Sequence, residues 1–137
     1  MKKLRSASLK IGKVIHEQLN DLIANYPIIA PQNTTYPFAV YKRTGLQVAN
    51  TKDIYNYEEE ANIEIIVVSQ SYDESLEIAT NMKMYLEHLN GTFKTSKNEV
   101  INISDITLTD TNEDFNNDAY LQIMNFKISI ENEPNIN

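Results

Sequence analysis

The sequence predicts an α+β domain in which a mostly antiparallel sheet of four to five strands carries two helices on one face. Apolar residues recur at helical spacing in two segments, and they alternate or run continuously in the remaining ones. The order of these segments is helix, strands, helix, strands. The chain has 137 residues and no internal repeat. We therefore expect a single domain over residues 1–137.

The first helix is expected over residues 8–25. Its apolar positions share one face, while Lys10, Lys13 and Glu17 lie mostly on the other. Gly12 weakens the first turns, since glycine is a poor helix former. The apolar face is formed by Ile11, Val14, Ile15, Leu19, Leu22 and Ile23.

An extended connector and the first strand follow this helix. Pro27, Pro31 and Pro37 each fix their own φ and disfavour helix at the preceding residue, which predicts an extended connector. Residues 38–43 are then expected to form the first strand. Residues 45–52 are polar and turn-rich, which indicates an exposed connection or the tip of a long hairpin.

The chain is organised around a central strand that runs directly into the second helix. Pairing resumes over residues 54–57, and the central strand is expected over residues 62–70, with apolar side chains on both faces. The second helix is expected over residues 72–89. Ser71 and Glu74 have the spacing of a capping box, in which each side chain accepts from the other residue's amide.

Two further strands complete the predicted sheet. Residues 93–99 are expected to form a loop. Residues 100–109 alternate as a strand whose apolar phase shifts, which predicts a bulge near residue 104. The last strand is expected over residues 120–131, and residues 131–137 are expected to form a disordered tail.

The predicted sheet has more apolar residues than two helices on one face can cover. Ile66, Val68, Leu121 and Ile123 point away from the helix-covered face in the expected strands. A small sheet that is apolar on both faces commonly buries its second face against another subunit. Curling of the sheet on itself is the alternative.

Composition excludes several classes of protein. The formal net charge of −7 argues against nucleic-acid binding through charge. The chain has no cysteine, so disulfides, thiolate nucleophiles and cysteine metal ligands are excluded. No stretch of about 18 apolar residues is present, so we expect no membrane span. The positive charges gather at the start of the chain, where residues 1–7 are expected to form a basic arm.

The sequence offers little material for catalysis. His16 and His88 each lie on an expected helix without a nucleophile motif beside them, which is typical of surface or boundary residues. No phosphate-binding glycine loop, nucleophile elbow or dinucleotide fingerprint occurs, and the chain has three glycines. We expect a protein that is not an enzyme and needs no cofactor.

The best metal candidate is an acidic segment over residues 110–118. Its oxygen-bearing side chains occupy alternate positions, as in a calcium-binding loop. Phe115 stands where such a loop needs glycine, and Leu121 stands where the bidentate glutamate belongs, so a solvated hairpin loop is the alternative. The candidate ligands are Asp110, Asn112, Asp114, Asn116 and Asp118.

A second acidic cluster lies at residues 58–60, beside Asp53. It favours a solvated strand end over a metal or catalytic carboxylate pair. Tyr55 and Tyr57 lie near it, and exposed tyrosines are typical of interfaces.

Several motifs together resemble the small tail-completion, or tail-terminator, proteins of tailed phages and prophages. The resemblance extends from the first helix to Ile130 and rests on structural motifs. These motifs are Tyr-Pro-Phe-Ala-Val-Tyr at 36–41, Thr-Lys-Asp at 51–53, Ile-Ile-Val-Val-Ser-Gln-Ser-Tyr-Asp-Glu-Ser at 65–75, Ile-Ala at 78–79, Glu-Asp at 113–114, Asp-Ala-Tyr-Leu-Gln at 118–122 and Phe126.

The resemblance implies a virion structural protein that assembles in the host cytoplasm into a ring, commonly a hexamer. Such a ring sits at the head–tail junction, stops growth of the tail tube and joins the tail to the head connector. DNA passes through its lumen without specific binding, and an acidic lumen would favour this passage. A different neck or head-completion ring protein is one alternative, and a cytosolic adaptor or calcium-binding module is another.

Contacts with other subunits or with the tube are expected on exposed loops of the rigid sheet, at residues 43–57 and 110–118. Apolar side chains of the second sheet face are expected to take part as well. The candidate contact residues are Arg43, Lys52, Asp53, Tyr55, Tyr57, Glu113, Asp114, Leu121 and Ile123.

Overall fold

A computed structural model describes residues 8–48, 57–95 and 97–132 of the chain. They form one α+β domain with a single sheet of six strands, in the order β1-β2-β3-β6-β5-β4. Only β1 and β2 are parallel, and every other neighbouring pair is antiparallel. The expected α+β class and mostly antiparallel sheet are therefore confirmed, but the expected strand number of four to five is too low.

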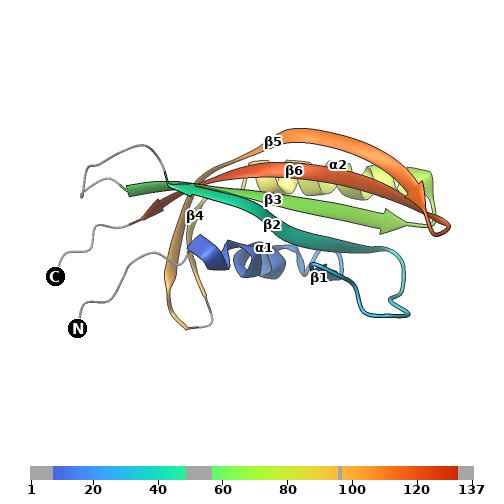
Figure 1. The fold of residues 1–137 in the computed structure, drawn as a ribbon, viewed down its shortest axis with the longest axis horizontal. Helices are drawn as coiled ribbons and strands as arrows, with labels where there is room; N and C mark the ends of the chain where they lie inside the picture. Colours follow the sequence, from blue (N-terminus) through green and yellow to red (C-terminus); the bar gives the residue numbers. More distant parts are fainter. Residues whose placement is uncertain (1–7, 49–56, 96, 133–137) are drawn as a thin grey trace.

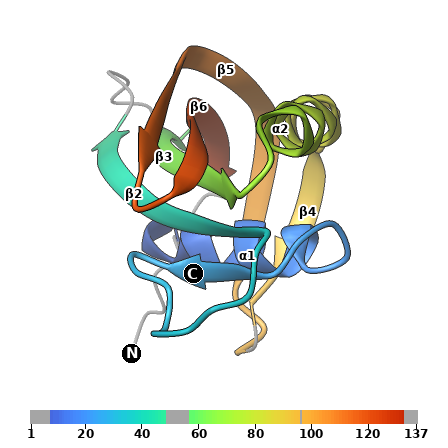
Figure 2. The same cartoon turned by 90° about the vertical axis from the view of Figure 1, so that its right-hand side faces the viewer.

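The four longest strands run side by side along the long axis of the molecule (Figure 1). The end view in Figure 2 shows that the sheet they form is strongly curved. The elements are η1 (Ser8–Lys10), α1 (Ile11–Leu19), β1 (Asn25–Pro27), β2 (Phe38–Val48), β3 (Tyr57–Ser69), α2 (Tyr72–Glu87), β4 (Gly91–Lys94), β5 (Val100–Asn116) and β6 (Ala119–Asn132).

One face of the sheet and both helices enclose the hydrophobic core. Alternate residues of the strands are buried on this face, as the period of two requires. Tyr85 of α2 donates a hydrogen bond to Gln18 of α1 over 3.2 Å, which joins the two helices. Fully buried core side chains come from α1, α2 and three strands: Ile11, Ile15, Leu19, Ile63, Ile65, Val67, Met82, Leu86, Ile101, Phe126, Ile128 and Ile130.

The central strand and second helix form as expected, with one difference at the cap. The amide of Glu74 donates to the hydroxyl of Ser71 over 3.2 Å, so Ser71 caps α2. The expected reciprocal bond from Glu74 is replaced, because its carboxylate accepts instead from the hydroxyl of Ser69 over 2.5 Å. The Ser69 hydroxyl in turn accepts from the amide of Ser71. The helix buries Ser75, Met82 and Leu86, while Leu76 is 37% exposed.

Replacing Ser71 by alanine is expected to lower the free energy of unfolding by about 1 kcal/mol, because the Glu74 amide loses its acceptor. Urea denaturation followed by circular dichroism measures the change. The matched control is Ser71→Asp, which keeps an acceptor at the cap and should remain near the wild type. Equal losses in both variants would contradict a capping role.

The first helix is shorter than expected. It begins with η1 and ends at Leu19, whereas the sequence predicted helix to residue 25. Asn25 explains the difference, because its buried side chain binds His16, Asn20 and the carbonyl of Ile23 and fixes an extended backbone. A short strand, β1, then pairs with β2 inside the segment that was expected to be connector only.

Other boundaries also differ from the expected ones. The expected turn from residue 45 is wrong as far as Val48, because β2 continues past an irregularity at Arg43 and Gly45. The expected loop at residues 93–99 contains the end of β4, which pairs with β5. The expected tail from residue 131 begins too early, since β6 reaches Asn132. The proposed basic arm and the rest of the tail lie outside the described residues.

The acidic segment at residues 110–118 is a β-hairpin and not a loop. β5 continues to Asn116, and β6 begins at Ala119. Asn117 and Asp118 form the two-residue turn, with φ of 50° and 60°. The expected bulge near residue 104 is confirmed by a register shift between Ile103 and Asp105, and a second shift follows between Leu108 and Asp110.

Candidate assembly surface

The sheet face opposite the helices, here called the open face, carries a cluster of apolar side chains. Residues that pair directly on neighbouring strands share one face of the sheet, so the side chains of this cluster form rows that run across the strands. All of these side chains are half-buried in the single chain, so part of their surface stays in contact with solvent. The apolar patch is formed by Phe38 and Val40 of β2, Ile66 and Val68 of β3, and Leu121 and Ile123 of β6.

The open face is apolar over only one half of its length. Beyond the apolar patch, the paired residues are polar or charged, and Lys42 lies 3.8 Å from Glu64. Lys127 lies 3.9 Å from Glu60 in the same half. The expected apolar surplus is therefore confined to the end near the β5–β6 turn. The open face therefore has a compact apolar area next to a polar area. Protein interfaces have a similar division into an apolar core and a polar rim.

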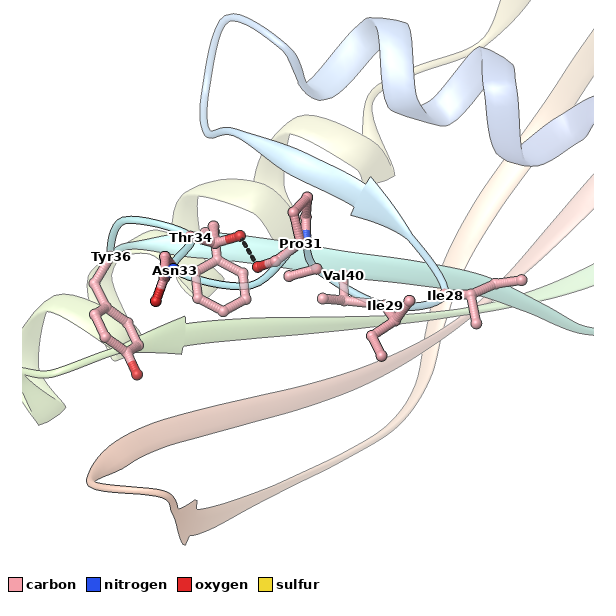
Figure 3. Close-up of a pocket in the computed structure, with 9 residues that line it drawn as sticks. Ile28, Ile29, Pro31, Asn33, Thr34, Tyr36 and Val40 are labelled. Atoms are coloured by element: carbon pink, nitrogen blue, oxygen red, sulfur yellow. Dashed lines mark hydrogen bonds between the residues drawn. The ribbon is translucent and has the colours of Figure 1, made fainter.

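The connector between β1 and β2 extends the apolar patch at one edge. A pocket of about 580 Å³ lies between this connector and β2, with Phe38 and Val40 in its lining. Figure 3 shows Tyr36, Ile28 and Ile29 around it, together with the hydrogen bond from Thr34 to the carbonyl of Pro31. Ile28 and Ile29 are 73% and 77% exposed. These isoleucines were missed by the sequence analysis, because nothing in the sequence places the connector beside β2.

The helix side of the β5–β6 hairpin is fixed against α2. Glu113 accepts a hydrogen bond from the Tyr72 hydroxyl at 2.9 Å and another from Gln122 at 2.9 Å. The hydrogen bond to Glu113, followed by partial burial, raises the pKa of the Tyr72 hydroxyl. Phe115 packs on Tyr120, with ring centroids 4.8 Å apart. Glu113 therefore stabilises the hairpin itself, while Asp114 and Asn112 are exposed.

The hairpin geometry spreads the candidate calcium ligands along an extended strand. In an extended strand, side chains on one face recur about every 7 Å, so the row from Asp110 to Asn116 spans about 20 Å. Calcium ligands must all lie 2.3–2.6 Å from one ion. In the described parts of the chain, no group of three or more histidine, aspartate or glutamate side chains could hold a metal ion. The candidate ligands of residues 110–118 are thus separated by the strand that carries them.

Isothermal titration of the protein with millimolar calcium is accordingly expected to give only the heat of dilution. The variant Asp110→Ala with Asp114→Ala serves as the control, because it removes two candidate oxygen ligands and should give the same trace. Saturable heat that the variant lacks would restore the calcium-loop hypothesis.

The remaining predicted contact residues are dispersed. Arg43 is exposed on β2 and donates to the carbonyl of Leu9 over 2.9 Å. Lys52, Asp53 and Tyr55 lie outside the described residues. Tyr57 begins β3, but its side chain is not among those described. The structure therefore brings together Leu121, Ile123 and Asp114, and it does not join them to Arg43.

The acidic cluster at residues 58–60 is only partly solvated. Glu59 is 4% exposed and accepts a hydrogen bond from Ser8 over 2.8 Å, so the expectation of a solvated strand end is wrong for this residue. The bond ties η1 to the start of β3. At the same end of the molecule, the ammonium of Lys10 bonds the carboxylate of Glu99 and lowers the pKa of that carboxyl.

The two histidines take part in local structure. The ring of His16 is 2.6 Å from the side-chain oxygen of Asn25 and stacks obliquely on Tyr41. His88 is exposed and lies 2.7 Å from the carbonyl of Met84. Both are surface or boundary residues, as expected.

No helix among the described residues is long and apolar enough to cross a membrane. No protein-family model matches the sequence, and a search of curated proteins finds no match. Among solved structures, a chain from the virion of a native gene transfer agent particle has a similar fold, with a TM-score of 0.63 and 13% sequence identity. The alignment covers 92% of this chain and 99% of that chain. At this identity the likeness is one of fold.

Proposed function

We propose that this protein is a non-enzymatic structural protein of a phage-like virion. Its role would be that of a tail terminator, or tail-completion protein. It would form a ring, commonly a hexamer, at the head-proximal end of the tail tube. There it would stop growth of the tube and join the tail to the head connector.

The observation that carries this proposal is the fold match to a virion chain over nearly the full length of both chains. The match covers 92% of this chain, so it concerns most of the domain. The motifs that resemble tail-completion proteins lie in the same elements, at the start of β2, along β3 and α2, and on the β5–β6 hairpin. Fold and motifs together support a virion component of this kind.

The open face supplies the surface that such a component needs. A partner that covers these half-buried apolar side chains stabilises the assembly, because burial removes apolar area from water. The polar half of the same face would keep a single copy soluble before assembly. This division supports an oligomer of identical subunits or a contact with the tube protein.

The charge of the protein fits a channel for DNA. A formal net charge of −7 repels the phosphate backbone, so DNA would slide through a ring without binding. Titration with duplex DNA at low salt should therefore give no saturable binding. A tight complex under these conditions would oppose this part of the proposal.

The proposed role is tested with a candidate tail tube protein from the same genome, which is polymerised in vitro. Adding this protein during polymerisation should shorten the tubes, and electron microscopy should show it bound at one end only. A neck or head-completion protein would instead bind the portal or connector and leave tube length unchanged. Binding along the whole tube, or to neither partner, would contradict the proposal.

A further inference from the structure

We infer that the apolar patch of one copy receives Leu9 of a second copy in a head-to-tail contact. The inference rests on the proposed self-assembly and names the two surfaces that would meet. On one copy these are Phe38, Val40, Ile66, Val68, Leu121 and Ile123. On the other copy the contact is made by Leu9, Lys13 and Arg43, here called the basic knob.

The basic knob projects an apolar side chain from a cationic surrounding. Leu9 is 65% exposed although its neighbours Ser8 and Ile11 are buried. Arg43 donates to the carbonyl of Leu9 over 2.9 Å, so its guanidinium lies beside this residue. Lys13 follows Leu9 by one helical turn and is exposed. An exposed leucine held rigidly in this way costs little conformational entropy when it is buried by a partner.

The apolar patch has a rim of the opposite charge. Asp114 pairs with Leu121 and Asn112 pairs with Ile123, so these polar side chains border the patch on the open face. Asp110 continues the same row of β5, and all three are exposed. The sequence from residue 98 to residue 126 contains no lysine, arginine or histidine. The apolar centre of the patch matches the apolar side chain of the basic knob. The carboxylates of its rim are opposite in charge to the cations of the knob.

The contact between the basic knob and the apolar patch cannot form within a single copy. Ser8 binds Glu59 and Ile11 belongs to the core, so η1 is fixed on the helix side of the sheet. The apolar patch lies on the opposite side. The contact must therefore form between copies, and it joins two different surfaces. Contacts of this heterologous kind close into rings when the rotation allows.

The sheet edges favour this face contact over extension of the sheet from copy to copy. From Ser104 to Asn116, β5 is an edge strand among the described residues, because β4 pairs only with residues 100–103. Two register shifts and the exposed carboxylates of Asp105 and Asp110 interrupt this edge. The opposite edge strand, β1, contains Pro27. Bulges, charges and proline are the features that prevent edge-to-edge pairing.

Site-directed crosslinking tests the contact directly, since the chain has no native cysteine. Leu9→Cys and Asn112→Cys are prepared as separate variants, mixed, and treated with a short bis-maleimide reagent. The mixture should give a crosslinked dimer, and a chain that carries both substitutions should give a ladder of multimers. Leu9→Cys mixed with Thr80→Cys is the control, because Thr80 lies on the exposed side of α2 and should stay uncrosslinked.

Charge exchange gives a second, independent test. Lys13→Glu with Arg43→Glu should weaken self-association about tenfold or more, and Asp110→Lys with Asp114→Lys should do the same. Mixing the two variants should restore association, because each altered surface then meets its complement. Circular dichroism verifies that both variants fold.

The outcomes separate this inference from the proposed function. Crosslinking of Leu9→Cys with itself would indicate a symmetric contact and overturn the inference. The inference would also be overturned if the wild-type protein stayed monomeric at every accessible concentration in solution and also bound the tube as single copies. Binding of the protein at the tube end, without any crosslink between Leu9→Cys and Asn112→Cys, would overturn the Leu9 contact but retain the terminator role. If Leu9→Cys and Asn112→Cys crosslinked as expected but the protein did not bind the tube end, the Leu9 contact would be retained and the terminator role overturned.

Discussion

Ile123→Lys is expected to abolish assembly while leaving the fold of the single chain intact. Ile123 belongs to the apolar patch, where it pairs with Ile66 of β3 on one side and with the rim residue Asn112 of β5 on the other. In the single chain the lysine ammonium can reach water, because the site is only half-buried. In an assembly the charge would be buried without a partner, at a cost of about 3–5 kcal/mol per contact. Such a cost raises the dissociation constant by about 100-fold or more.

Light scattering after size-exclusion chromatography measures this effect, alone and with tubes. The matched control is Ser129→Lys, which places the same side chain on the same strand and face but in the polar half. It should assemble as the wild type does. If both variants assembled normally, the apolar patch would not be a contact surface.

Phe126→Ala is expected to have the largest effect on the stability of the single chain. Phe126 is 1% exposed and lies in the core between the sheet and the helices. Its removal leaves a cavity and should cost about 3–5 kcal/mol. This is a large part of the stability of an ordinary domain, which is about 5–15 kcal/mol. Urea denaturation should show a lower midpoint with an unchanged slope.

The control for this prediction is Ile123→Ala, on the same strand but on the opposite face. Its side chain is half-buried, so the loss should be well below that of Phe126→Ala. Equal losses would mean that the open face is sealed within a single copy. That result would remove the physical reason for assembly.

The parts of the fold that could be predicted are those whose own sequence determines them. β3 and α2 have strong apolar patterns and a cap at Ser71, so their existence and order follow from local signals. The bulge in β5 follows from a change of parity between Ile103 and Ile106, which are both buried. In these elements local preference and tertiary packing agree.

The parts that could not be predicted are determined by pairing with neighbours. β1 and β4 are short and have no apolar pattern, and each forms because a longer strand offers it a free edge. The polar residues from Asp110 to Asn116 form a strand because β6 pairs with each of them across a two-residue turn. The Asn117–Asp118 pair was the local signal for that turn.

The candidate site was predictable in its centre and not at its borders. Parity alone placed Leu121 and Ile123 on the face away from the core. The contributions of Leu9, Ile28 and Ile29 depend on where η1 and the connector pack. The periodicity of apolar residues in the sequence does not predict this packing. Arg43 was predicted at the end of the first strand and it lies within β2, but its bond to the Leu9 carbonyl could not be predicted.

The open face of each copy is expected to be covered in the assembly. The most direct measurement is a cryo-electron microscopy reconstruction of the protein bound at the end of a tail tube. We expect a closed ring in which Phe38, Ile66 and Ile123 are buried by the adjacent subunit or by the tube. A ring in which these three side chains face solvent or the lumen would contradict this expectation.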